Sequence, residues 1–135
     1  MGGATVGGAC DHAAMPARFK DICLDAGDHH SLADWWCAAM GYVHRDEHEP
    51  PEGGWVRPHD WPVPIVDPDG GGPLIWVNPV PEKKTVKNRM HLDVLGDTEE
   101  LLALGATVVR RRDDEIEWDV LADPEGNEFC VFKPR

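Results

Sequence analysis

The stretch from Lys87 to Asp93, KNRMHLD, holds the side chains best suited to acid–base or metal chemistry. Successive side chains of an extended segment point to opposite faces, so Arg89, His91 and Asp93 share one face. Histidine changes charge close to physiological pH, and a neighbouring carboxylate can orient its ring for proton transfer. The stretch therefore predicts a strand that transfers protons or binds a ligand, although a solvated strand face would show the same alternation.

An internal repeat places this stretch in a larger plan. Cys23-Leu24-Asp25 is echoed by His91-Leu92-Asp93, and each tripeptide is followed within a few residues by Gly-Asp and a predicted helix. The turn sequence Asp67-Pro68-Asp69-Gly70 returns as Asp123-Pro124-Glu125-Gly126. Duplication of this kind predicts two equivalent sheets, with a ligand site where they meet.

Each half of the chain is predicted to form one strand, one helix and three further strands. Asp28 and Asp97 stand at the N-caps of helices predicted at 29–40 and 98–104, and Gly41 and Gly105 stand where these helices should end. The strands are predicted, in chain order, at 19–25, 42–47, 55–66, 73–80, 87–93, 106–112, 117–122 and 127–133. Prolines at 58, 62 and 64 favour an edge or bulged position for the strand at 55–66.

The whole chain has the size and charge of one acidic domain. Residues 1–15 are predicted to be a flexible arm, and 16–135 a single domain. The net charge of −12 opposes binding to nucleic acid or to an anionic membrane, and no apolar run approaches the roughly 20 residues of a membrane span. The four cysteines show no paired spacing, which favours reduced thiols and a cytoplasmic location.

Tryptophan side chains offer a second way of holding a ligand. Indoles in strand-like segments can stack on a planar molecule. Such indoles stand at positions 55, 61, 76 and 118. Strand alternation places the Trp76 side chain on the face expected to meet the ligand, whereas Trp35 and Trp36 on the first helix are expected in the core. His29 and His30, in the first turn of that helix, are expected at the surface.

The repeated βαβββ plan, the KNRMHLD stretch and the closing segment DPEGNEFCV together resemble the vicinal oxygen chelate superfamily, and within it the glyoxalase-like proteins. The resemblance covers about residues 19–132. It implies an α+β fold in which two modules, at about 19–80 and 88–133, form curled mixed sheets around a cup, and it implies a homodimer. Some members of the superfamily hold a divalent metal in the cup on four side chains. Others bind antibiotics without a metal.

The resemblance also assigns the four ligand positions of metal-dependent members to residues of this chain. His91 matches the histidine that opens the second module. The equivalent position in the first module falls on Asp21 or on Cys23, depending on the alignment. At the ends of the two modules, Trp76 or Asn78 and Cys130 stand where glutamates are expected. Because three of the four positions depart from the usual set, we expect no metal; if one binds, Zn²⁺ on His91, Cys130 and Asp21 fits these donors best.

The resulting functional hypothesis is a small organic ligand bound in a cup between the two modules. The protein would be a metal-independent lyase or isomerase in which His91 acts as acid or base and Asp93 or Asp25 orients it. The residues expected to contact the ligand are Asp21, Cys23, Trp76, Asn78, Arg89 and Cys130. The alternative is a non-catalytic protein of the antibiotic-binding or resistance type, and a metal-dependent glyoxalase or dioxygenase is less favoured.

Overall fold

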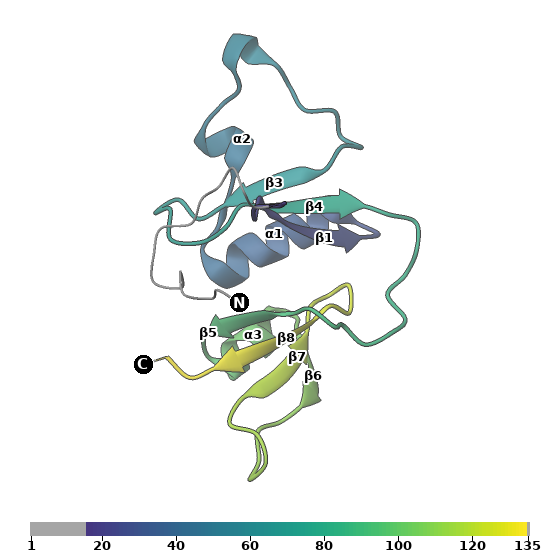
Figure 1. Ribbon diagram of the computed structural model, residues 1–135, viewed down its shortest axis with the longest axis vertical. Helices are drawn as coiled ribbons and strands as arrows, with labels where there is room; N and C mark the ends of the chain where they lie inside the picture. Colours follow the sequence, from purple (N-terminus) through teal and green to yellow (C-terminus); the bar gives the residue numbers. More distant parts are fainter. Residues whose placement is uncertain (1–15, 135) are drawn as a thin grey trace, which may run out of the picture.

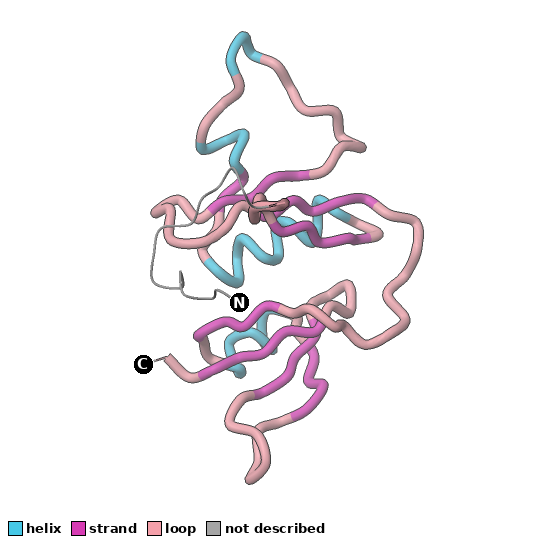
Figure 2. Tube along the Cα trace, viewed as in Figure 1, coloured by secondary structure: helices cyan, strands magenta, loops and turns pink. Residues whose placement is uncertain are grey.

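The computed structural model describes residues 16–134 (Figure 1, Figure 2). The predicted N-terminal arm lies outside the described residues. The first module contains β1 (Ile22–Ala26), α1 (His29–Met40), β2 (Val43–His44), α2 (Arg45–His48), a 3₁₀ turn, η3 (Glu52–Gly54), β3 (Val63–Val66) and β4 (Ile75–Pro79). The second contains β5 (Leu92–Leu95), α3 (Thr98–Leu104), β6 (Thr107–Arg110), β7 (Asp119–Ala122) and β8 (Glu128–Phe132). No helix within 16–134 is long and apolar enough to span a bilayer.

Each module builds one four-stranded mixed sheet, and the two sheets share one strand order. Sheet A is ordered β1-β4-β3-β2 and sheet B β5-β8-β7-β6. In both, the first and last strands of the module are parallel, and the remaining pairs are antiparallel. The predicted α+β fold of two duplicated modules is thereby confirmed, and Figure 1 shows the first module above the second.

The helix ends lie where the sequence predicts them. The Asp28 carboxylate accepts a hydrogen bond from the backbone N–H of Ser31 at 3.1 Å, and α1 ends at Gly41, whose φ of 73° is left-handed. Asp97 caps α3 in the same way, and Gly105 ends that helix. Residues next to each end, a capping aspartate before the helix and a glycine after it, account for the agreement between the predicted and observed ends.

Several predicted strands are shorter than expected. The strand predicted at 42–47 ends at His44, and the residues that follow form the short helix α2. Only Val63–Val66 of the predicted 55–66 strand pairs, because the preceding prolines lack a backbone N–H for a sheet ladder. The strand predicted at 87–93 begins at Leu92, so His91 lies immediately before β5.

The core joins the two modules. Ile75 and Val77 of β4 and Phe129 and Val131 of β8 are almost completely buried on the faces that meet the helices. Trp36 of α1 packs edge-on against Phe129 with ring centroids 4.9 Å apart, and this places a first-module helix against the second-module sheet. Trp35 and Trp36 are buried, as predicted.

Hydrogen bonds from the Asp123–Gly126 turn reinforce this junction. The indole N–H of Trp36 donates to Asp123 Oδ2 at 2.9 Å. The Glu125 carboxylate accepts from the backbone N–H groups of Gly27 and Asp28 at 2.9 and 3.0 Å, at the start of α1. The turn that closes the second module therefore also holds the first helix in place.

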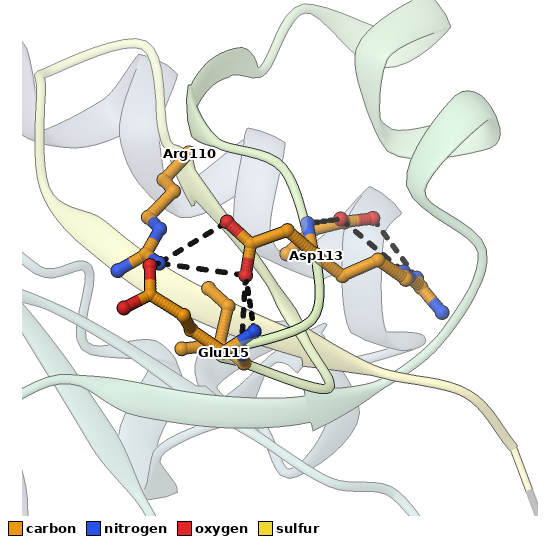
Figure 3. Close-up of polar contacts among 6 residues, drawn as sticks. Arg110, Asp113 and Glu115 are labelled. Carbon is orange, nitrogen blue, oxygen red and sulfur yellow. Dashed lines mark hydrogen bonds and ion pairs between the residues drawn. The ribbon is translucent and has the colours of Figure 1, made fainter.

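The loop between β6 and β7 is organised by carboxylates (Figure 3). Asp113 accepts hydrogen bonds from the backbone N–H groups of Glu115 and Ile116, and Arg110 reaches Asp113 at 3.2 Å and Glu115 at 3.1 Å. These contacts hold the Asp113 pKa below its usual value, chiefly through the Glu115 N–H. The loop lies at the far end of sheet B from the first module, as Figure 1 shows.

Candidate functional site

His91, Asp93 and Cys130 form one cluster on sheet B. Asp93 of β5 pairs directly with Cys130 of β8, and His91 precedes β5 on the same face. His91 Nδ1 lies 3.2 Å from Asp93 Oδ1 and 3.8 Å from Cys130 Sγ. One donor atom from each residue lies within 4.8 Å of the other two. The cluster can therefore support either proton transfer by the imidazole or binding of one metal ion.

The protonation chemistry of the cluster favours the imidazole as its reactive group. Burial raises the pKa of the Cys130 thiol, and the neighbouring Asp93 carboxylate raises it further. The thiol is therefore neutral near pH 7 and is a poor nucleophile. Because Nδ1 of His91 faces Asp93, Nε2 is the ring nitrogen left to meet a ligand. The side chain of His91 is 39% exposed, so the imidazole is open to a ligand.

The corresponding face of sheet A holds two separate polar pairs. The indole N–H of Trp76 donates to Asp21 Oδ2 at 2.9 Å, and Lys20 contacts the same carboxylate. Lys20 first, and then Trp76, lower the pKa of Asp21. Asn78 donates to Asp25 at 3.4 Å. Among residues 16–134, no hydrogen bond or ion pair connects either pair with the cluster on sheet B.

This arrangement determines where the predicted ligand residues stand. Asp93 lies against His91, whereas Asp25 contacts Asn78 on the other sheet. In the group of possible metal ligands, Asp93 stands with His91 and Cys130 where Asp21 was predicted. The Asp21 carboxylate instead contacts Lys20 and Trp76. Arg89 is exposed and Cys23 is an exposed free thiol. The ligand roles of Arg89, Cys23 and Asn78 remain predictions.

Trp76 lies on the expected face, but cations cover its ring. The guanidinium carbons of Arg45 and Arg57 lie 5.0 and 5.4 Å from the Trp76 ring centroid, and Lys20 Nζ lies 5.9 Å from it. Trp55 and Trp61 were predicted in a strand but stand in the loop before β3, because pairing begins only at Val63. The contacts of Arg45 and Arg57 with Trp76 were not predicted, because both arginines were expected in strands, whereas Arg45 begins α2 and Arg57 stands in the loop before β3.

The expected exposure of His29 is wrong. His29 is only 7% exposed, and its Nε2–H donates to the carbonyl oxygen of His59 at 2.9 Å. His30 donates to the same oxygen at 2.7 Å, and its ring stacks on that of His59 with centroids 4.0 Å apart. The loop that brings His59 to α1 is irregular, so no periodicity in the sequence indicated this contact.

A residue that the sequence reading missed positions the segment before His91. Glu128 of β8 accepts a hydrogen bond from the backbone N–H of Asn88 at 2.7 Å, and Lys84 Nζ lies 3.6 Å from the same oxygen. These contacts lower the pKa of Glu128, with the Asn88 N–H as the largest cause. Glu128 shares its strand face with Cys130, which is the sequence signal that could have drawn attention to it.

Comparison with known proteins identifies the fold. The model of the glyoxalase-like domain family matches residues 21–132. The chain is structurally similar to the genomically encoded fosfomycin resistance protein FosX of Listeria monocytogenes (TM-score 0.62, 12% identity, 90% of this chain and 94% of that chain covered).

Two further solved structures show the same likeness. A glyoxalase-related enzyme from Fulvimarina pelagi gives a TM-score of 0.57 at 16% identity, with 87% of this chain and 88% of that chain covered. The trypanothione-dependent glyoxalase I of Leishmania major gives 0.56 at 15% identity, with 87% and 86% covered. No curated protein matches the chain.

Proposed function

The chain belongs to the glyoxalase-like domain family, and from that premise we propose that it binds a small organic molecule beside His91 and transfers a proton to or from it. The observation that carries the proposal is the 3.2 Å contact between His91 Nδ1 and Asp93 Oδ1. In a neutral His91 whose proton lies on Nδ1, facing the carboxylate, Nε2 would carry the lone pair, and an unprotonated imidazole nitrogen is a general base.

The reaction class follows from the groups in the cluster. A base without a strong nucleophile beside it suits abstraction of a proton next to a carbonyl, which is a step of isomerases and lyases. The neutral, buried thiol of Cys130 supplies an apolar wall on one side of the imidazole. Asp93 orients the ring and stabilises the imidazolium formed when the proton arrives.

The alternative function for the same site is ligand binding without catalysis. One structural relative is a fosfomycin resistance protein, and this supports a role in small-molecule resistance as well as in metabolism. In a pure binder, the Asp93→Asn variant would keep ligand affinity and there would be no turnover to lose. In an enzyme, the same variant would keep affinity and lose turnover.

The experiment incubates the protein with a metabolite extract and follows both retained and converted compounds by mass spectrometry. We expect His91→Ala to lower turnover by about 100-fold or more, the scale of general acid–base catalysis, with a small change in melting temperature. His48→Ala, which removes an exposed histidine of α2, is the matched control. Unchanged binding and turnover in His91→Ala would refute the proposal.

A bound Zn²⁺ is the third candidate, because the cluster supplies nitrogen, oxygen and sulfur donors of a kind that Zn²⁺ accepts. His91, Asp93 and Cys130 would hold the ion, which would polarise a ligand carbonyl. Under the first proposal, a chelator leaves the melting temperature unchanged. A large drop that Zn²⁺ restores, and that Cys130→Ser abolishes, would favour the metal site.

We also propose that the protein is a homodimer in the cytoplasm. Apolar side chains on the outer surface of the second module support an interface between copies, since Leu95 is 61% and Val109 50% exposed. Light scattering coupled to size-exclusion chromatography measures the mass. A single species of monomer mass at micromolar concentration would contradict the dimer.

A further inference from the structure

A cavity of about 520 Å³ lies outside the His91 cluster, beneath the segment that connects α2 with β3. This segment forms the arch at the top of Figure 1. The cavity is bounded by α1 through His30 and Asp34, by α2 through Glu47, and by the arch through Trp55. Its volume falls within the usual range for small-molecule sites.

Arg57 connects the arch with α2 through Asp46 and with sheet A through the ring of Trp76. The Arg57 guanidinium forms two hydrogen bonds to Asp46, at 2.7 and 3.3 Å, and its side chain is 15% exposed. The same group lies 5.1 Å from the Trp55 ring centroid and 5.4 Å from that of Trp76. Stacking between two indoles together with a bidentate carboxylate contact fixes the wall of the cavity without any ligand.

The apolar surface of the cavity is aromatic and aliphatic. Trp55 remains 44% exposed even though Arg57 covers one part of it. Val63 and Pro64 of β3 are buried and line the cavity alongside it. A flat apolar body could therefore rest on the indole while its edge meets the start of β3.

The charges around the cavity are mainly negative. Three carboxylates line it, those of Asp34, Asp46 and Glu47, against the single guanidinium of Arg57. Asp46 is engaged by Arg57, and Asp34 by His44 Nε2 at 2.6 Å. Among residues 16–134, no hydrogen bond or ion pair reaches the Glu47 carboxylate. The acidic balance of the site, and Glu47 in particular, favours a positively charged ligand group.

We propose that this cavity is a separate binding site for organic cations, compounds that carry an ammonium group on an aromatic body. The ammonium group lies between the Glu47 and Asp34 carboxylates, and the aromatic body rests against Trp55. A cation held near an indole gains from the ring quadrupole as well as from the carboxylates, whereas an anion would be repelled. The site is independent of the proton transfer proposed at His91.

The test uses three probes with one shape and different charge: 1-naphthylmethylamine, 1-naphthylmethanol and 1-naphthoate. Binding to the full ¹⁵N-labelled chain is followed at about pH 8 through the indole N–H signals, with Trp55 assigned from a Trp55→Leu variant. We expect the amine to shift the Trp55 signal and to bind at least about tenfold more tightly than the alcohol. Its affinity should fall as salt is added, while that of the alcohol should not.

Matched variants localise the charge. Glu47→Gln should weaken amine binding about 3- to 10-fold, and Trp55→Leu about tenfold. Glu52→Gln, which removes an exposed carboxylate of the same arch outside the cavity, should change affinity less than twofold. His91→Ala should leave amine binding unchanged, so the two proposals fail separately.

Three results would overturn the proposal. Equal affinity for the amine and the alcohol would remove the role of charge. Equal effects of the Glu47 and Glu52 variants would show a diffuse acidic surface and no defined site. A shift confined to the Trp118 indole, next to β7, or loss of binding in His91→Ala would place the amine in the second module.

Discussion

Replacing Trp36 with Phe tests whether the two modules unfold as one unit. Trp36 is 1% exposed, and its indole N–H donates to Asp123 Oδ2 at 2.9 Å across the module junction. A hydrogen bond to a charged group contributes roughly 1.5–3 kcal/mol, and the ring atoms lost next to Phe129 cost about 1 kcal/mol more. Asp123 keeps its bonds from the N–H groups of Glu125 and Asn127, which limits the penalty. We therefore expect a loss of about 2–4 kcal/mol.

The assay is urea unfolding followed by circular dichroism. We expect a single transition for the unmodified protein and for Trp36→Phe. Trp118→Phe is the matched control, because its indole is half-buried against Phe132 and forms no hydrogen bond among residues 16–134. It should cost less than about 1 kcal/mol. A double-mutant cycle with Asp123→Asn isolates the coupling across the junction. A loss below about 1 kcal/mol, or two transitions of which only one moves, would refute the reasoning.

Two further predictions concern charge and thiol reactivity. Arg112 is the largest cause that lowers the pKa of the buried Asp119 far below its usual value, so stability is full above the unfolded value of about 3.9 and falls as the pH drops below it. Asp119→Asn should therefore destabilise the protein at pH 7 and flatten its acid unfolding curve; an unchanged curve would contradict this. At about pH 8, iodoacetamide should modify the exposed Cys23 well before Cys130, and also before Cys37, whose pKa burial raises to about 11. Peptide mass spectrometry measures the order, and equal rates would count against the burial of these thiols.

The local features of the fold could be predicted because they depend on neighbouring residues. The caps at Asp28 and Asp97 form within one turn of each helix, and the Asp67–Gly70 turn closes by a 3.0 Å hydrogen bond from the Gly70 N–H to the Asp67 carbonyl oxygen. The duplication was visible because it repeats residue types at matching positions. Strand ends were less predictable, since pairing depends on a partner strand and on prolines such as Pro62.

The candidate site was also predictable in part from local sequence and in part not. Alternation predicted that His91 and Asp93 share a face, and their side chains lie 3.2 Å apart. The sequence did not exclude Asp25 as a partner for His91, and sheet pairing places that carboxylate beside Asn78. Which carboxylate meets the imidazole is a question of strand neighbours, and residues 25 and 93 belong to different sheets.

By itself, then, the sequence determined the two modules, the ends of α1 and α3 and the ionisable face on which His91 stands. Only the tertiary structure decided that Cys130 and Asp93 are the neighbours of His91, that guanidinium groups cover Trp76, and that the arch forms one side of a second, open cavity. The physical reason is the distance along the chain over which each interaction acts. Caps and alternation act over a few residues, whereas these contacts join segments far apart in the chain that meet only after both sheets have paired and the core has closed.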